Sequence, residues 1–234
     1  MSKNISRIAL VLAMLVVMPS AILAQKQKLQ AVDLGLSVKW ANMNVGASSP
    51  FEYGNYYAWG EIAEKRFYSN VIKSKHISLE YVNDRNAVEK LLKYSKEDGL
   101  TQLQLSDDAA SQNCGKSWFM PTEAHIKELI DNCDWTLIEQ NGTQGYLIKS
   151  RKNDNSIFLP ITGFMIGEKT KGTQRRFCST QGYYWSSTLA NTEDKKNAFA
   201  LSIIISVNPN GKTGSYQLVP FHRTCGCVIR PVCH

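Results

Sequence analysis

The sequence predicts an α+β domain of mostly short antiparallel strands, and two features of its order support this class. One amphipathic helix pattern lies near the middle of the chain, over residues 122–133. After it, strand patterns alternate with turn signals to the end. A helix followed by a run of antiparallel strands is typical of α+β folds rather than of alternating α/β folds. We expect one or two helices in all.

The helix pattern runs from Thr122 to Cys133. Apolar residues recur at the spacing of one helix face, beginning at Ile126. Thr122 is suited to the N-cap position. The third residue after it is His125 rather than Glu or Gln, so a reciprocal capping box is not expected. Residues 87–94 are a candidate for a second, short helix.

Strands are expected in segments of β-branched and aromatic residues bounded by turn residues. These segments are 38–41, 55–59, 145–149, 157–159, 182–188, 198–206 and 228–232. Residues 152–155 predict a hairpin turn between two of them, and Asn208-Pro209-Asn210-Gly211 is a strong turn signal. Residues 62–86 are polar and uneven, which predicts an excursion over the surface.

Residues 1–24 have the pattern of a secretory signal peptide. Basic residues come before an apolar run over 8–23, and a small residue closes it. The run is shorter than the roughly 20 residues of a membrane-spanning helix. We therefore expect cleavage before Gln25, and we expect residues 25–234 to be exported as one domain with no transmembrane segment.

Charge and cysteine content narrow the choice of partners and of compartment. The formal net charge is +7, and removal of the signal segment leaves a mildly basic chain. A mild excess of this kind permits attraction to acidic glycans, but it is a weak argument for nucleic acid, which we do not expect as a partner. Six cysteines in an exported chain predict at least two disulfides. Six cysteines allow many pairings, so the spacing alone leaves the connectivity open.

Four tryptophans and three charged residues are expected to be structural. Trp40, Trp59, Trp118 and Trp185 are expected to bury large areas and fix irregular backbone, and the last three lie directly beside Gly or Ser. Arg230 in the last expected strand is interpreted as a buried partner of a carboxylate or of carbonyl groups. The pair Asp107-Asp108 is interpreted as a loop cap or as the partner of Arg230.

Five sequence blocks, taken in order, resemble one bacterial family. They are VDLGLSVKWANMNVGASSPFEYGNYYAWGE (32–61), LQLSDDAASQNCGKSWFMPT (103–122), SIFLPITGF (156–164), GYYWSST (182–188) and VIRPV (228–232). Their order and spacing resemble the Fibrobacter succinogenes major paralogous domain, over about residues 31–232. That family is similar in fold to C-type-lectin-like domains and to the formylglycine-generating sulfatase modifiers. The resemblance implies a C-type-lectin-like fold, but a fold alone does not establish a function.

The resemblance also implies where a ligand would bind. Related lectin-like proteins with variable ligand-binding faces carry the variation before the final strand, which corresponds here to about Leu189–Arg223. The candidate contacts in this region are Asn191, Lys195, Lys196, Asn208, Asn210, Tyr216, Gln217 and Arg223. Asn, Tyr and Arg are adaptable recognition residues, although an ordinary solvated rim would have the same composition.

A basic loop is the second candidate site. It contains Lys169, Lys171, Arg175 and Arg176. Four cations in one loop suit an anionic glycan, although a solvated charged loop has the same composition.

The cysteines have several interpretations. Lectin-like folds often tie a helix to the terminal strand, so the resemblance implies a Cys133–Cys233 disulfide, with Cys178–Cys225 as a second pair. The tail Cys225-Gly226-Cys227, with Cys233-His234, also suits a soft-metal site. A redox pair like that of the formylglycine-generating enzymes is a further alternative, but those enzymes separate their two cysteines by more residues.

No catalytic motif is present in the sequence. There is no His-Glu-x-x-His, no Gly-x-Ser-x-Gly and no glycine-rich phosphate loop. The tripeptides with which sugar-binding C-type lectins hold calcium are also missing, so no cofactor is expected. We expect an exported, non-catalytic module that binds a glycan or a surface protein without calcium. A cysteine-dependent oxidase or metal-binding enzyme, and a structural envelope protein with no discrete ligand, are the alternatives.

The signal-peptide assignment makes a direct prediction. Mass spectrometry of the exported protein is expected to find Gln25 at or near the N-terminus. An exported chain that retains residues 1–24 would contradict the assignment.

Overall fold

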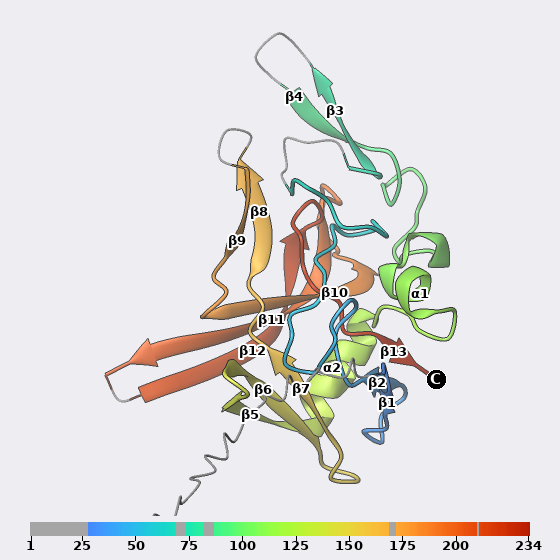
Figure 1. The fold of residues 1–234 in the computed structure, drawn as a ribbon. Helices are drawn as coiled ribbons and strands as arrows, with labels where there is room; N and C mark the ends of the chain where they lie inside the picture. Colours follow the sequence, from blue (N-terminus) through green and yellow to red (C-terminus); the bar gives the residue numbers. More distant parts are fainter. Residues whose placement is uncertain (1–27, 69–73, 82–86, 169–171, 210) are drawn as a thin grey trace, which may run out of the picture.

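The computed structural model describes residues 28–68, 74–81, 87–168, 172–209 and 211–234. Within these ranges the chain is α+β, with mostly short antiparallel strands and two α-helices, which confirms the predicted class at this level (Figure 1). The helices are α1 (Ala109–Cys114) and α2 (Glu123–Asn132). The strands are β1 (Ala31–Val32), β2 (Lys39–Ala41), β3 (Ile77–Tyr81), β4 (Ala87–Leu91), β5 (Cys133–Gln140), β6 (Thr143–Ser150), β7 (Ser156–Pro160), β8 (Phe164–Glu168), β9 (Gly172–Arg176), β10 (Gln181–Leu189), β11 (Asn197–Asn208), β12 (Gly211–His222) and β13 (Val232–Cys233). The proposed signal segment, 1–24, lies outside the described residues.

One small sheet joins the beginning and the end of the described chain. Its strand order is β1-β2-β13, and both neighbours run antiparallel to β2. Val32 and Val232 pair with the same residue, Trp40, from its two sides. Trp40 is buried, so this sheet closes over the core rather than extending into solvent.

The longest strands form the sheet β10-β11-β12, which extends outward as an arm (Figure 1). β11 and β12 pair along their whole length, from Asn197 opposite His222 to Asn208 opposite Gly211. The predicted turn at 208–211 therefore joins them. The predicted hairpin of β6 and β7 also forms, with Ile148 opposite Ile157.

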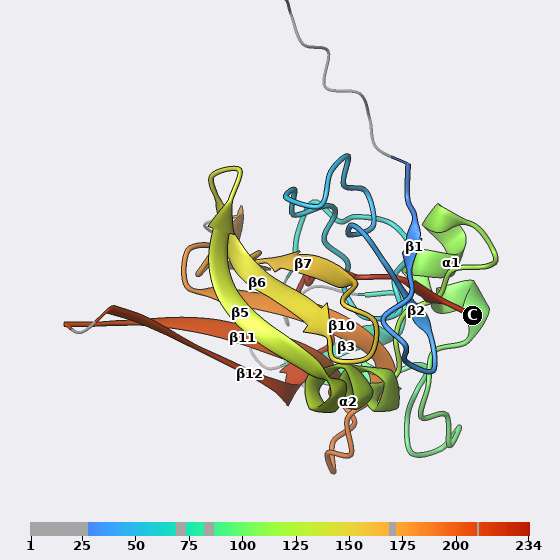
Figure 2. The ribbon, with the colours of Figure 1, turned by 90° about the horizontal axis from the view of Figure 1, so that it is seen from below.

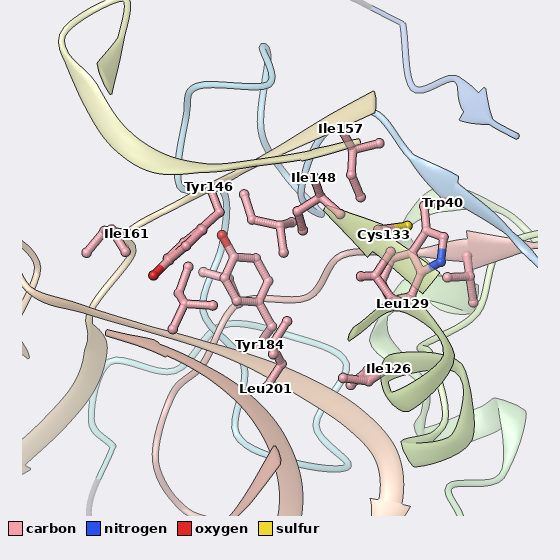
Figure 3. Packing of buried hydrophobic residues seen from close by; sticks show 14 of the residues in the cluster. Trp40, Ile126, Leu129, Cys133, Tyr146, Ile148, Ile157, Ile161, Tyr184 and Leu201 are labelled. Atoms are coloured by element: carbon pink, nitrogen blue, oxygen red, sulfur yellow. The ribbon is translucent and has the colours of Figure 1, made fainter. Parts of the chain in front are cut away.

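The main core lies between this long sheet and a second layer. Figure 2 shows the β5-β6-β7 sheet lying across β11 and β12, with α2 at one end. The facing side chains interdigitate, and Tyr146 from β6 lies against Tyr184 from β10 (Figure 3). Ile126 and Leu129 project from α2 into the same core. Burial of apolar surface from three elements in one cluster stabilises their arrangement.

A second cluster lies on the opposite face of β10 and β11. Trp185 and Ala200 face it from neighbouring positions of the two strands. Trp59 adds its ring and donates its indole N–H to the carbonyl of Ser186 at 2.8 Å. Trp40, Trp59 and Trp185 are thus core residues as predicted, because each is at most 2% exposed. Trp118 is only half-buried, so the prediction was wrong for this ring.

The N-terminus of α2 differs from the sequence prediction. Thr122 is the N-cap, and its hydroxyl accepts the backbone N–H of His125 at 3.2 Å. The imidazole Nδ1 of His125 accepts the backbone N–H of Thr122 at 3.2 Å, so a reciprocal capping box is present. The prediction of no box was wrong because a neutral imidazole nitrogen accepts a hydrogen bond as a Glu or Gln oxygen would.

Three further predictions fail in whole or in part. Residues 87–91 form strand β4, paired with β3, and not the start of a helix. Segment 55–59 forms only an isolated bridge between Tyr57 and Cys227. Of segment 228–232, only Val232 enters a strand, β13. The apolar residues of these two segments are buried in mostly irregular backbone rather than in a ladder.

Arg230 is buried among backbone carbonyls, as the sequence suggested. It donates to the carbonyls of Ala41 and Phe158 and to the side-chain oxygen of Asn44, at 2.8–3.0 Å. Burial lowers the pKa of its guanidinium to about 10, so it stays charged at neutral pH. Asp107 and Asp108 do not pair with it.

No helix within the described residues is long and apolar enough to cross a membrane.

The capping box makes the stability of the fold depend on pH. Burial lowers the pKa of His125 below its usual value of 6.5, because it disfavours the charged ring. Only the neutral ring has a nitrogen that can accept the N–H of Thr122. The unfolded chain therefore binds a proton first as the pH falls, and the stabilisation present above pH 6.5 is lost below it. We expect His125→Gln, which keeps an acceptor that does not titrate, to lose less stability between pH 7 and pH 5 than the parent protein. Urea unfolding at both pH values measures this, and equal losses would contradict the role of the imidazole.

Candidate functional site

The region 189–223 is spread along a long hairpin rather than gathered in one face. Lys195 and Lys196 lie in the loop between β10 and β11, and Asn191 lies at the start of that loop. Asn208 lies at the other end of β11, while Asn210 lies outside the described residues. Eleven steps along a strand cover roughly 35 Å, so the loop and the turn cannot contact the same small ligand.

Tyr216 packs against other rings and is not a free recognition residue. Its ring stacks on Trp135, with centroids 4.2 Å apart and planes at 16°. It also meets the ring of Tyr146 edge-on at 5.7 Å. The neighbouring Gln217 is exposed and lies opposite Ser202 in the ladder. The aromatic contacts show that Tyr216 joins β12 to the β5-β6 layer.

Arg223 is buried, which corrects its interpretation as a ligand contact. Only 1% of the residue is exposed. It donates to the carbonyls of Lys93, Tyr94 and Lys195 at 3.0–3.1 Å, and its guanidinium lies 4.9 Å from the centre of the Trp59 ring. Burial lowers the pKa of the guanidinium to about 10. Arg223 therefore joins two loops from beneath and faces no solvent.

The two loops that Arg223 joins enclose a hollow at the surface. Its volume is about 740 Å³. We call it the loop hollow, and it is lined by Lys90, Leu91, Leu92, Ser95, Lys96, Glu97, Asp98, Glu193 and Asp194. One wall comes from β4 and the turn after it, and the other comes from the loop between β10 and β11. Part of the region 189–223 thus borders a concave site.

The turn that forms one wall is held by Asp98. Its carboxylate accepts the backbone N–H groups of Tyr94, Ser95 and Leu100 at 2.6, 3.1 and 2.9 Å. Slight burial opposes ionisation, but these hydrogen bonds outweigh it and lower the pKa of Asp98. A carboxylate that remains charged and bonded to three amides fixes the backbone of the turn.

A buried carboxylate, Asp107, holds the same turn from the other side. It contacts the ammonium groups of Lys75 and Lys93 at 2.5 and 2.6 Å and the hydroxyl of Tyr94 at 2.5 Å. Burial opposes its ionisation, but the hydrogen bonds from the two lysines and the tyrosine lower its pKa well below the usual range. A loop cap is predicted for this pair of aspartates, and the neighbouring Asp108 provides one by accepting the N–H of Ser111 at 3.0 Å.

The opposite wall is tied to β4 by an ion pair. Glu89 lies 3.2 Å from the ammonium nitrogen of Lys196 and 3.4 Å from the imidazole of His222. Burial opposes ionisation of Glu89, but hydrogen bonds from His222 and Lys196 lower its pKa. Lys196 is therefore engaged within the protein and is not a free ligand contact.

The basic loop separates into residues with different environments. Lys169 and Lys171 lie outside the described residues. Arg175 lies on β9 with its guanidinium 4.6 Å from the centre of the Tyr53 ring. Arg176 is exposed, and its side chain makes no ion pair or hydrogen bond with any described residue. Arg175 also forms a side-chain hydrogen bond with Tyr56, so among the described arginines of this loop only Arg176 has a guanidinium without a described partner.

All six cysteines lie in the described residues, and each has a free thiol. The proposed pairs Cys133–Cys233 and Cys178–Cys225 are therefore not formed. Cys133 is fully buried beside Trp40 in the main core (Figure 3), so packing rather than a bridge accounts for its position.

The thiols of the C-terminal pair are in an environment that disfavours reaction. Burial raises the pKa of Cys225 to about 12, and burial raises the pKa of Cys227 well above its usual range. The thiolate is the reactive form, so neither residue is activated as a nucleophile. Within the described residues, no group of three or more His, Cys, Asp or Glu side chains is placed to hold a metal ion.

Sequence reasoning missed most of the residues that line the loop hollow. Glu97 and Glu193 are separated by almost a hundred positions, and no local pattern joins them. The Asp98-Gly99 dipeptide is a turn signal, and it could have identified the turn that forms one wall of the loop hollow.

Comparison with known proteins adds no relative. No protein-family model, no curated protein and no solved structure matches this chain. The resemblance to the major paralogous domain therefore remains an interpretation of the five sequence blocks.

The position of Arg223 predicts a structural effect of its removal. Arg223→Ala would leave three carbonyl groups without their donor, at a cost of about 1–3 kcal/mol for each that stays buried. We expect the free energy of unfolding to fall by at least about 2 kcal/mol. Denaturant unfolding measures this, with Lys195→Ala as the control, since its side chain makes no described hydrogen bond. A loss below about 0.5 kcal/mol for Arg223→Ala would contradict the buried role.

Proposed function

We propose that this chain is an exported, non-catalytic binding module with a C-type-lectin-like fold, similar to the major paralogous domain. The loop hollow is its ligand site. The observation that carries the proposal is that both walls of the hollow are fixed by charged side chains, of which Arg223 and Asp107 are buried. Arg223 joins the walls, and Asp107 and Asp98 hold the turn. A site whose backbone is fixed before binding loses little conformational entropy when the ligand arrives.

The chemistry of the walls favours a protein ligand over a neutral glycan. Glu97, Asp98, Glu193 and Asp194 outnumber the two lysines on the walls. Leu92, directly after β4, adds an apolar surface that is 52% exposed, and Val88 on β4 is 51% exposed. A segment of a surface protein with basic and apolar side chains complements this combination. Carboxylates that bind basic side chains do not require calcium.

The alternatives receive less support. An oxidase that uses Cys225 and Cys227 needs an accessible thiolate, but both thiols are buried and their pKa values are raised. A structural envelope protein with no discrete ligand does not need a preformed hollow.

The proposal predicts which exposed carboxylates matter for binding. Glu97→Gln/Glu193→Gln is expected to weaken binding to an array of Lys- and Arg-containing peptides by about three- to tenfold, since each exposed ion pair contributes roughly 0.2–1 kcal/mol. Biolayer interferometry with the exported protein, with and without EDTA, measures the affinity. Binding should persist in EDTA and weaken as salt rises.

The control is Glu139→Gln, which removes an exposed carboxylate from β5, outside the loop hollow. It should bind as the parent protein does. Unchanged binding of the Glu97/Glu193 double variant, or selection of neutral glycans over basic peptides, would contradict the proposed ligand class. Loss of binding in EDTA would contradict calcium independence.

A further inference from the structure

A group of aromatic rings reaches the surface where the β8-β9 hairpin meets the long sheet. The ring of Phe164 stacks on Phe177 with centroids 5.8 Å apart and planes at 22°. It also meets Tyr183 and Phe221 edge-on, at 5.2 and 5.1 Å. Tyr183 and Phe221 stack on each other at 4.3 Å. The inner rings are half-buried, so they form a firm support for the outermost one, Phe177.

Phe177 is exposed in a backbone conformation that a bulky residue rarely adopts. It is 53% exposed, and its φ is +55°. The turn after it fixes this conformation, because the carbonyl of Phe177 accepts the N–H groups of Thr180 and Gln181 at 3.1 and 2.8 Å. Burial does not account for a large aromatic side chain held outward in a left-handed conformation. Backbone strain of this kind is often retained at binding sites.

The preceding residue, Arg176, places a charge beside the ring. It lies opposite Phe164 in the β8-β9 ladder, and residues that face each other across a ladder share one face. Gly163 lets the backbone come close here, because a Cβ at that position would lie 2.3 Å from the carbonyl oxygen of Arg176. Arg176 has no ionic or hydrogen-bonded partner among the described residues, whereas Arg175 lies over the ring of Tyr53.

An amide group completes the surroundings of the rings. The side-chain oxygen of Gln181 accepts the hydroxyl of Tyr183 at 3.0 Å. No hydrogen bond with a described residue uses the side-chain nitrogen of Gln181, so this nitrogen can donate to a ligand. The surface therefore combines one exposed ring, one unpaired guanidinium and one amide donor.

We propose that Phe177, Arg176 and Gln181 form a second binding site, which takes a carboxylated sugar such as a hexuronic acid unit of a glycan. The face of an aromatic ring is electronegative and attracts the C–H bonds of a pyranose ring. The planar guanidinium binds a carboxylate through two parallel hydrogen bonds. None of the residues that line the loop hollow belongs to this site, so the inference goes beyond the function proposed for that hollow.

The size of the surface favours a sugar over a protein. A stable protein interface buries roughly 800 Å² on each partner. Here a single aromatic ring is strongly exposed and its neighbours are half-buried, which suits one or two sugar units.

The test uses a galacturonic acid tetramer as the probe and a neutral galactose tetramer as the comparison. Isothermal titration of the exported protein is expected to show binding of the acidic tetramer at least tenfold tighter than binding of the neutral one. Phe177→Ala should weaken binding of the acidic tetramer at least tenfold, because the stacking surface is lost. Arg176→Gln should weaken it about fivefold and remove most of its salt dependence.

Arg175→Gln is the matched control, since it removes the same charge from the same hairpin but on a residue that lies over Tyr53. It should bind as the parent protein does. Thermal unfolding checks that the Phe177→Ala variant is folded. The substitution removes an exposed ring, so the melting temperature should not fall. Equal affinity for the two tetramers, or unchanged binding in Phe177→Ala, would overturn the proposal. The Glu97→Gln/Glu193→Gln variant should still bind the acidic tetramer, so failure at one site is distinguishable from failure at the other.

Discussion

The guanidinium of Arg230 is the interaction on which the arrangement of the chain depends. It joins the carbonyl of Ala41 and the side chain of Asn44, near the beginning, to the carbonyl of Phe158 in the β6-β7 hairpin. These segments lie 72 to 189 positions from Arg230. A group with five N–H donors in one plane can bond several carbonyls at once, which an ammonium group cannot do with the same geometry. A buried charge that is surrounded by carbonyl dipoles avoids most of the penalty of leaving water.

Arg223 also bonds several backbone carbonyls at once, in the two loops that form the walls of the loop hollow. It has no carboxylate within hydrogen-bonding distance, so its charge is balanced by carbonyl dipoles and by the faces of Trp59 and Tyr94. The fold therefore uses buried arginines to organise irregular backbone, where ladder hydrogen bonds are not available. This matters because much of the chain before α2 is irregular, and its polar backbone groups still need partners when they are buried.

Features that depend on residues close together in the sequence could be predicted, and features that depend on distant residues could not. The helix α2, the β6-β7 hairpin and the turn at 208–211 depend on residues close together in sequence, and patterns of a few residues identified them. β12 was missed because its first five residues are exposed and include two glycines, so they show no alternation. The expected helix at 87–94 does not form: β4 occupies its first five residues, and Val88 and Leu92, which lie one helical turn apart, are exposed rather than packed on a core. Arg223 and Tyr216 were placed in the ligand face because sequence alone does not distinguish a buried polar side chain from an exposed one.

The small sheet that joins the two ends has a topological consequence. Because β1 and β13 flank the same strand, the described chain enters and leaves the fold at neighbouring points. A short linker could join the two ends of the described chain, and new ends could be made elsewhere, for instance at the turn between β11 and β12. Neither change would alter which strands pair. The order in which the segments are connected is therefore separable from the three-dimensional arrangement they adopt.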